Sequence, residues 1–376
     1  MNHWVDALVA LQASGTAAVV VSVVGTRGSV PRAAGTHMIV TREKLHGTIG
    51  GGHLEFQAIG IARDLIGGAP GAQRLRRFPL GASLGQCCGG VVNLLFEPVA
   101  GPAEWIAHAA TLRNERTPFV TLVPTTGDDP AGRLVVTARE AYGDAIGDRA
   151  DAIALAREVL RSGESAQLVH VGADGTPRWF VDPVRDDGFD VVLFGAGHVG
   201  RALVKLFADL PCHVTWIDTR DDEFPSEIPV NVSATCSDAP EADVDAAPPG
   251  VFFLVMTHDH ALDERIAERI LERNTFAYFG LIGSLPKRRR FEQRMARRGM
   301  PAERFAAMTC PIGVAGIEGK EPATIAVAVV AQILQLRSAL AARPAEAGPT
   351  RSPLAIADLD LEDPCRSGSS LTAKSR

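Results

Sequence analysis

The sequence predicts an α/β protein made of an N-terminal mixed α/β domain and a Rossmann-like domain with a doubly wound parallel sheet. The length of 376 residues favours two domains. A glycine-rich turn at 195–200 lies between a strand-like run and helical spacing, which is typical of a nucleotide-binding fold. Because a polar, turn-rich stretch at 182–188 separates the halves, we expect domains over 1–183 and 188–340. Residues 341–376 lack an apolar pattern and are expected to form a disordered tail.

Composition and charge limit the classes of function. Hydrophobic residues make up 46% of the chain and charged residues 22%, so a large core can be buried. The net charge of −6 argues against a general nucleic-acid binder. No basic leader precedes the first predicted helix, and no apolar run reaches the roughly 20 residues of a membrane span. The six cysteines follow neither a disulfide-framework nor a zinc spacing. We therefore expect a cytoplasmic protein with reduced thiols and no membrane contact.

The N-terminal domain is expected to begin with a helix over 2–14 and a buried strand over 17–24, whose β-branched run is nearly continuous. A glycine-containing loop with two arginines, Arg27 and Arg32, follows. Backbone N–H groups and guanidinium groups suit phosphate, so the loop could be an anion cradle. The local pattern alone favours a solvated turn.

Three consecutive glycines, Gly50, Gly51 and Gly52, connect a strand-like stretch with a helix expected through about Leu65. At a helix N-terminus, exposed N–H groups and the helix dipole point at one place, which makes an anion site. The alternative is a tight turn in which glycine is needed for positive φ.

The adjacent cysteines Cys87 and Cys88 lie in a glycine-bounded loop between predicted strands over 73–80 and 91–97. Adjacent cysteines rarely form a disulfide with each other because the bond would strain the peptide between them. A thiolate here could act as a nucleophile, a sulfur acceptor or a ligand of a soft metal. A buried structural thiol is the equally weighted alternative.

The rest of the N-terminal domain alternates between helix and strand patterns. The predicted elements are a helix over 103–113, a strand over 118–123, helical spacing through 153–160, and a hairpin of strands over 166–171 and 178–182.

The second domain opens with the strongest fold signal in the chain. Gly195, Gly197 and Gly200 complete the GxGxxG pattern between a strand and a helix. Asp218 ends the next strand, about 20 residues after the glycines, where an acidic residue binds a ribose hydroxyl in dinucleotide-binding folds. The pattern predicts a Rossmann fold with NAD(P) as a candidate ligand.

Further polar residues follow the next strand, over 251–256. His258 and His260 could bind a metal or act as acid–base groups, or they could be incidental neighbours of a helix-capping Asp259. The basic run 287–290, together with Arg294, Arg297 and Arg298, is interpreted as a solvated helix face rather than a nucleic-acid site.

Seven blocks in a fixed order carry a resemblance to a known family. They are GSVPR at 28–32, GTIGGGHLE at 47–55, QCCGG at 86–90, FGAGHVG at 194–200, THD at 257–259, GLIGS at 280–284 and PIG at 311–313. With these blocks the chain resembles the XdhC/CoxI family of accessory proteins for molybdenum hydroxylases, most closely the members that are accessory proteins for xanthine dehydrogenase.

The resemblance implies a chaperone for the molybdenum cofactor, Mo-molybdopterin. Such a protein presents the cofactor to a cysteine desulfurase for exchange of an oxo for a sulfido ligand. It then delivers the product to the molybdenum-binding subunit of xanthine dehydrogenase. Cys87 or Cys88, with Cys88 preferred, would contact molybdenum, and Gly50–Gly52 with Arg27 and Arg32 would hold the phosphate of the pterin.

Two alternatives belong to other classes. One is a Rossmann oxidoreductase that binds NAD(P) through Gly195, Gly197, Gly200 and Asp218, with His258 or His260 as the acid–base group. The other is a dimerising scaffold that docks the desulfurase and the target enzyme, in which the glycine loops are only structural. A homodimer is compatible with each reading.

Overall fold

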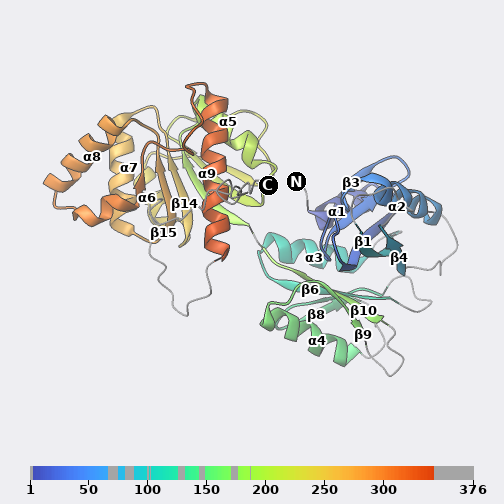
Figure 1. Cartoon of the computed structure of the whole chain (residues 1–376). Coiled ribbons are helices and arrows are strands. Elements are labelled where there is room, and N and C mark those ends of the chain that lie inside the picture. The colour runs from blue at the N-terminus through green and yellow to red at the C-terminus, as the bar shows by residue number, and fades with distance from the viewer. Residues whose placement is uncertain are drawn as a thin grey trace, which may run out of the picture. The chain divides into compact units, whose positions relative to one another are not determined.

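The computed structural model describes residues 3–66, 75–80, 89–99, 101, 103–125, 132–143, 149–170, 177–186 and 188–342. They form two compact units that divide between Asp186 and Asp187, within the polar stretch at 182–188 (Figure 1). Cys87, Cys88 and the expected tail beyond residue 342 lie outside the described residues.

The first unit contains an antiparallel sheet in the order β3-β2-β1-β5-β4. Its strands are β1 (Ala18–Arg27), β2 (His37–Val40), β3 (Leu45–Gly47), β4 (Leu75–Pro79) and β5 (Val91–Val99). The central strand β1 is buried over its first seven residues, as its apolar run predicts. Helix α2 (Gly52–Leu65) covers one face, and α1 (Trp4–Ala13) and α3 (Glu104–Asn114) pack against the other.

A second five-stranded sheet completes this unit, in the order β8-β7-β6-β10-β9. Its strands are β6 (Phe119–Pro124), β7 (Leu134–Val136), β8 (Ala141–Gly143), β9 (Gln167–His170) and β10 (Pro177–Val184). The predicted hairpin is confirmed, because β9 and β10 pair antiparallel. Helix α4 (Arg149–Ser162) packs on one face through Ala152, Ala156 and Val159.

A buried polar chain joins the two sheets. His37 on β2 lies with Nδ1 2.8 Å from the hydroxyl of Ser22 on β1 and with Nε2 2.9 Å from the carboxylate of Asp182 on β10. The side chains of His37 and Asp182 are only 4% and 5% exposed. Such a network fixes one sheet against the other, since each buried polar group needs its partner.

A buried arginine makes a second link between the sheets. Arg133, which precedes β7, places Nη2 2.7 Å from the Glu97 carboxylate on β5. Its guanidinium carbon lies 4.9 Å from the ring centre of Trp4 and 4.5 Å from that of Trp105. The charge is therefore paired and enclosed between two aromatic rings, as burial of a charge requires.

The second unit is a parallel six-stranded sheet in the order β13-β12-β11-β14-β15-β16. Its strands are β11 (Phe189–Phe194), β12 (Cys212–Asp218), β13 (Val232–Cys236), β14 (Val251–Val255), β15 (Phe276–Leu281) and β16 (Met308–Thr309). Counted along the chain this is 3-2-1-4-5-6, the doubly wound Rossmann order. The predicted fold class is confirmed.

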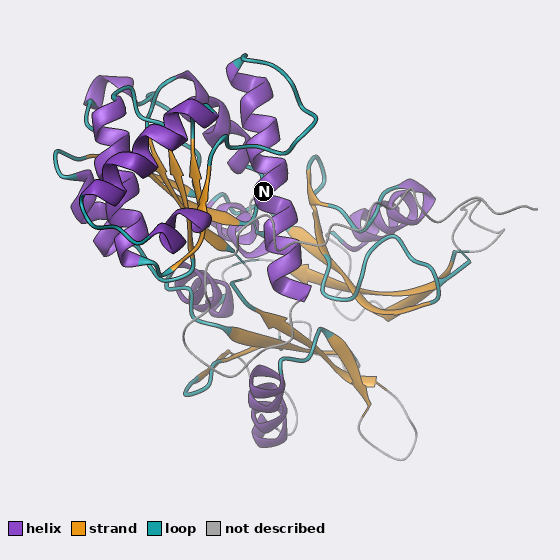
Figure 2. Cartoon of the chain, turned by 60° about the vertical axis from the view of Figure 1, so that its left-hand side comes forward, coloured by secondary structure: helices purple, strands orange, loops and turns teal. Residues whose placement is uncertain are grey.

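Helices cover both faces of this sheet (Figure 2). On one face α5 (His198–Phe207) and α9 (Pro322–Ala342) share a core cluster with the strands. On the other lie α6 (Pro240–Ala246), α7 (His260–Arg273) and α8 (Leu285–Arg297).

Helix α9 corrects one expectation. Its stretch Pro322–Leu340 is long and apolar enough to cross a membrane, judged by length and composition only. Ala326, Val329 and Ile333 of this stretch are nevertheless fully buried against the sheet and α5. A core helix of a globular domain has the same length and composition.

Candidate functional site

Three of the predicted blocks meet at one end of the first sheet. The loop 28–32 lies against Gly90, where a Cβ atom would stand 2.3 Å from the carbonyl oxygen of Ser29. The same loop lies against Gly50, where a Cβ atom would stand 2.5 Å from Cβ of Pro31. Glycine is therefore needed at both positions for the backbones to approach. The segment that follows Cys88 and the triple-glycine turn are thus held by one shared loop.

The triple-glycine turn has the backbone conformation that only glycine adopts readily. The φ angles of Gly50, Gly51 and Gly52 are 119°, 75° and 66°. L-residues are disfavoured in this region, so the tight-turn interpretation of these glycines is confirmed.

The protein's own carboxylate fills the anion position of this turn. Glu55 Oε2 accepts hydrogen bonds from the Thr48 hydroxyl at 2.5 Å and from the N–H groups of Ile49 and Gly51 at 3.0 Å. Burial raises the pKa of Glu55, but the hydrogen bonds from Thr48 and from the backbone outweigh burial and hold the pKa below its ordinary value. A phosphate at Gly50–Gly52 would have to displace Glu55, so the predicted cradle there stays a prediction.

The two arginines predicted for this loop are Arg27, which the structure places as the last residue of β1, and Arg32 in the loop itself. Arg27 and Arg32 are exposed. Among the described residues, neither guanidinium forms a hydrogen bond or an ion pair. Arg32 lies beside the turn, with Cγ 3.5 Å from the position of a Cβ atom at Gly50.

The GxGxxG turn of the second unit is explained largely by packing. A Cβ atom at Gly195 would stand 2.3 Å from the carbonyl oxygen of Met256, and one at Gly200 would stand 2.0 Å from the carbonyl oxygen of Gly195. Gly197 is the N-cap of α5, and a Cβ atom there would meet nothing within 4 Å. Two of the three glycines are therefore required by the fold alone.

Asp218 lies where a ribose-binding acid is expected, at the end of β12, but its oxygens are engaged. Oδ2 accepts from the Ala196 N–H at 2.6 Å and from Arg220 Nη2 at 3.1 Å. Oδ1 accepts from the Arg220 N–H and Nε, both at 3.0 Å. Burial raises the pKa of Asp218, and the bonds from Arg220 and Ala196 outweigh burial and lower it.

These four bonds test the fit of NAD(P). A carboxylate has about four acceptor positions, and here all are used within the protein. A ribose hydroxyl would have to displace Arg220, whose Nη1 is also bound to Glu223 at 2.9 Å. As the side chains stand, the nucleotide does not fit the predicted mode, and we assign it no step.

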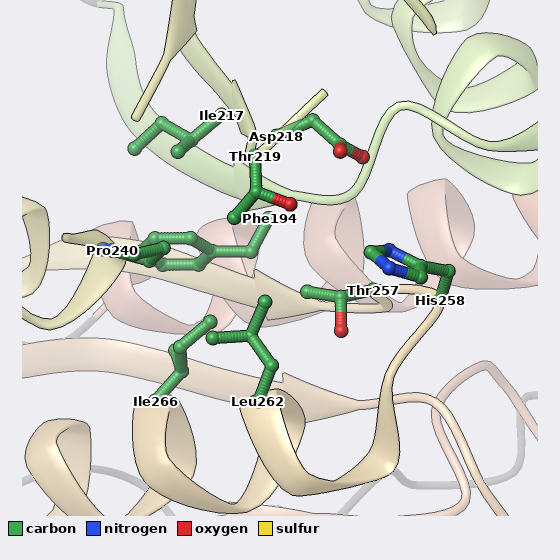
Figure 3. A pocket seen from close by; sticks show the side chains of 9 residues that line it. All are labelled: Phe194, Ile217, Asp218, Thr219, Pro240, Thr257, His258, Leu262 and Ile266. Carbon is green, nitrogen blue, oxygen red and sulfur yellow. The ribbon is translucent and has the colours of Figure 1, made fainter. Parts of the chain in front are cut away.

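A small pocket with about 10 Å³ of free volume lies at the carboxyl ends of β11, β12 and β14 (Figure 3). This is the position where open α/β sheets bind ligands, but the volume is below the roughly 300 Å³ at which ligand pockets begin. Asp218 and His258 stand at the polar end of the pocket, while Phe194, Leu262 and Ile266 form its apolar wall. The structure thus brings two predicted site residues, Asp218 and His258, to one pocket.

The two histidines differ in position. His258 lines the pocket, whereas His260 is the first residue of α7, with Nδ1 3.9 Å from Asp263 Oδ2. Within the described ranges, no group of three or more His, Cys, Asp and Glu side chains is placed to hold a metal ion. Asp259 caps α7 by accepting from the Ala261 N–H at 2.8 Å, as the structural alternative expected.

Sequence reasoning missed a buried ion pair beside this pocket. The Asp263 carboxylate is fully buried and accepts from the Thr257 N–H at 2.9 Å, from the Thr257 hydroxyl at 2.7 Å and from Lys287 Nζ at 2.7 Å. Lys287 also donates to the Ile282 carbonyl at 2.9 Å. This pair ties the THD block to the GLIGS block.

The basic run also supplies helix-to-helix pairs. Arg294 of α8 and Arg298, the C-cap of α8, both bind Glu264 of α7, at 2.8 and 2.9 Å. These pairs support the interpretation of the run as a helix face.

Comparison with known proteins finds a family match within each unit. A family model described as "XdhC and CoxI family" matches residues 11–79, and one described as "XdhC Rossmann domain" matches residues 191–333. The uncharacterized protein YqeB of Escherichia coli (strain K12) is 29% identical over 151 residues, which are 39% of this chain. The chain matches only 27% of the length of that relative.

A solved structure extends the similarity of fold to nearly the whole chain. It is the crystal structure of a xanthine dehydrogenase from Bacillus halodurans, with a TM-score of 0.66 and 20% sequence identity. The match covers 92% of this chain and 98% of that chain. At this identity the likeness concerns the fold.

Proposed function

The chain belongs to the XdhC and CoxI family, and from this membership we propose that it is an accessory protein for a molybdenum hydroxylase without turnover of its own. Membership supports a role in the maturation of xanthine dehydrogenase. The cargo is the molybdenum cofactor, Mo-molybdopterin. The protein holds it while a cysteine desulfurase exchanges an oxo for a sulfido ligand, and delivers it to the molybdenum-binding subunit.

The observation that carries this proposal is the meeting of three blocks at one end of the first sheet. Gly90 and Gly50 both pack against the loop 28–32, so the backbone that directly follows Cys88 is anchored next to two exposed arginines. A thiolate of Cys88 or Cys87 is a suitable soft ligand for molybdenum. The guanidinium groups suit the phosphate of the pterin.

Cofactor content of the purified protein tests the proposal. The full chain is produced in cells that make the cofactor, and molybdenum is measured by elemental analysis and pterin by fluorescence after oxidation. We expect both in the wild type and a strong loss in Cys88→Ala. Cys236→Ala is the matched control, because Cys236 is an exposed thiol in the other unit.

The outcomes separate the parts of the proposal. A wild-type protein without molybdenum or pterin contradicts cofactor binding. A Cys87→Ala/Cys88→Ala variant that keeps the cofactor as the wild type does contradicts the thiolate role alone. Delivery is tested by adding the loaded protein to apo-hydroxylase, with and without desulfurase, and measuring the gain of hydroxylase activity.

A further inference from the structure

One face of the first sheet changes from apolar to basic towards the end of β1. Near the middle of the sheet, Val24 and Leu95 on this face are buried in a cluster with residues of the second sheet. Beyond them, Asn93 on β5 pairs with Gly25 on β1 and with Arg77 on β4. A polar region that contains Asn93 and Arg77 therefore lies next to the apolar cluster of Val24 and Leu95.

Arg27 belongs to the same region. Side chains two residues apart on a strand point to the same face, so Arg27 follows Gly25 on this face of β1. The Asn93 side chain lies over Gly25, since a Cβ atom there would stand 3.3 Å from Asn93 Nδ2. Arg77 is thus directly opposite Asn93 on one side, and Arg27, which pairs with Val91, lies diagonally from Asn93 on the other.

None of the three side chains has a partner within the described part of the chain. Arg27 and Arg77 are exposed and form no ion pair or hydrogen bond there, and the Asn93 amide forms none. Other arginines of this unit do have carboxylate partners, as Arg113 has in Asp6 and Arg133 in Glu97. Two guanidinium groups on one face of the sheet repel each other when they approach, and an anion bound between them would remove that repulsion.

The spacing suits one phosphate group. The backbones of β1 and β4 are separated by β5, hence by about 10 Å, and Arg27 and Arg77 are offset by two residues, or about 7 Å, along the strands. Two extended arginine side chains can span this distance and meet at one anion, with the Asn93 amide as a neutral donor between them. Guanidinium groups bind phosphate through paired N–H bonds, and doubly charged anions gain most from two of them.

We propose that Arg27, Asn93 and Arg77 form a binding site for the phosphomonoester end of a small ligand. This site differs from the triple-glycine turn, whose N–H groups are held by Glu55. The inference rests on the proposed function only for the identity of the ligand, which would be the phosphate of the molybdenum cofactor. It adds Arg77 and Asn93 to the binding residues.

Binding of phosphate to the full chain tests the site, with calorimetry as the measurement. Inorganic phosphate is compared with GMP and guanosine, which present a phosphomonoester on a heterocycle and the same heterocycle without it. Arg27→Gln and Arg77→Gln are each expected to weaken GMP binding at least about tenfold, since each removes a charge-assisted contact. Arg76→Gln is the matched control, because Arg76 is the exposed neighbour of Arg77 on the opposite face of β4.

Each result decides between the readings. Loss of GMP binding in Arg27→Gln and Arg77→Gln, with Arg76→Gln within twofold of the wild type, supports the site. Equal loss in all three variants, or no binding of GMP to the wild type, overturns it. If GMP binds no more tightly than inorganic phosphate, the assignment to a phosphomonoester of a larger ligand is wrong.

The cofactor content of the same preparations keeps this test separate from the proposed function. Phosphate binding that depends on Arg77, in a protein that carries no molybdenum or pterin, leaves the site standing and contradicts the cofactor proposal. Cofactor retained at the wild-type level in Arg27→Gln and Arg77→Gln leaves cofactor binding standing and overturns the assignment of the cofactor phosphate to this site.

Discussion

Replacing His37 with alanine is expected to destabilise the first unit severely. His37 is the shared partner of Ser22 and Asp182, and the Asp182 side chain is only 5% exposed. Alanine leaves the Asp182 carboxylate buried without its partner. Breaking a buried pair in this way costs about 3–5 kcal/mol of the free energy of unfolding. The free energy should therefore fall by several kcal/mol, far more than for a surface histidine.

Hydrogen exchange measured by mass spectrometry is the suitable assay, because the chain has two units. Exchange of amides in β1, β2 and β10 should accelerate in His37→Ala, while amides in β11 and β14 provide an internal reference. His53→Ala is the matched control, since His53 is exposed on α2 and should change stability by less than about 0.5 kcal/mol.

A double-mutant cycle isolates the pair. Removing Asp182 as well, in His37→Ala/Asp182→Ala, removes the unpaired charge and should recover part of the loss, with a coupling energy of about 1–3 kcal/mol. A cost of less than about 1 kcal/mol for His37→Ala, or additive effects of the two substitutions, would refute the view that this pair fixes the sheets.

Three further perturbations have expected outcomes that follow from single contacts. Gly90→Ala should lower the melting temperature and the cofactor content, because its Cβ atom would meet the Ser29 oxygen at 2.3 Å, whereas Gly89→Ala, which meets nothing within 4 Å, should do neither. Glu55→Gln should cost about 1–2 kcal/mol near neutral pH. Since the pKa of Glu55 is lowered in the folded state, the wild type should lose this contribution as the pH falls below the ordinary value of 4.5, and the variant should show no such loss. The pKa of His3 is lowered to about 3, mainly by burial, so His3 protonates at a higher pH in the unfolded chain than in the folded one. The wild type should therefore lose stability as the pH falls from about 6.5 towards 3. Urea titrations of His3→Asn should show a weaker pH dependence of stability, and a dependence equal to that of the wild type would contradict the assignment.

The elements of the fold could be predicted because their patterns are local. The apolar run of β1, the hairpin of β9 and β10 and the alternation of strands and helices after residue 188 all appear in the structure. The alternation implies parallel strands joined by right-handed crossovers, and the GxGxxG spacing favours the Rossmann type among the doubly wound folds. The short strands β7 and β8 were not predicted, because three residues between turns carry no period.

The candidate site was predicted only in part, because its decisive contacts are between distant strands. The proximity of Gly90, Gly50 and the loop 28–32 depends on the register of β1 with β5, which the local sequence does not contain. Likewise Arg77 is one of two adjacent arginines, and only the pairing of β4 with β5 distinguishes it from Arg76.

The GxGxxG turn shows why motif spacing alone predicted a fold better than a ligand. Gly195 and Gly200 are required where strand and helix approach within 2.3 Å and 2.0 Å of a missing Cβ atom, whatever the domain binds. Asp218 keeps the spacing of a ribose-binding acid but uses its four acceptor positions on Ala196 and Arg220. In this geometry Asp218 binds the backbone of the glycine turn and has no acceptor position left for a ribose hydroxyl. The same argument applies to Glu55 in the first unit, where a carboxylate again fills the donors of a glycine turn. In both glycine turns a carboxylate of the protein thus accepts from the backbone, whereas the Arg27 and Arg77 guanidinium groups at the end of the first sheet have no acceptor among the described residues.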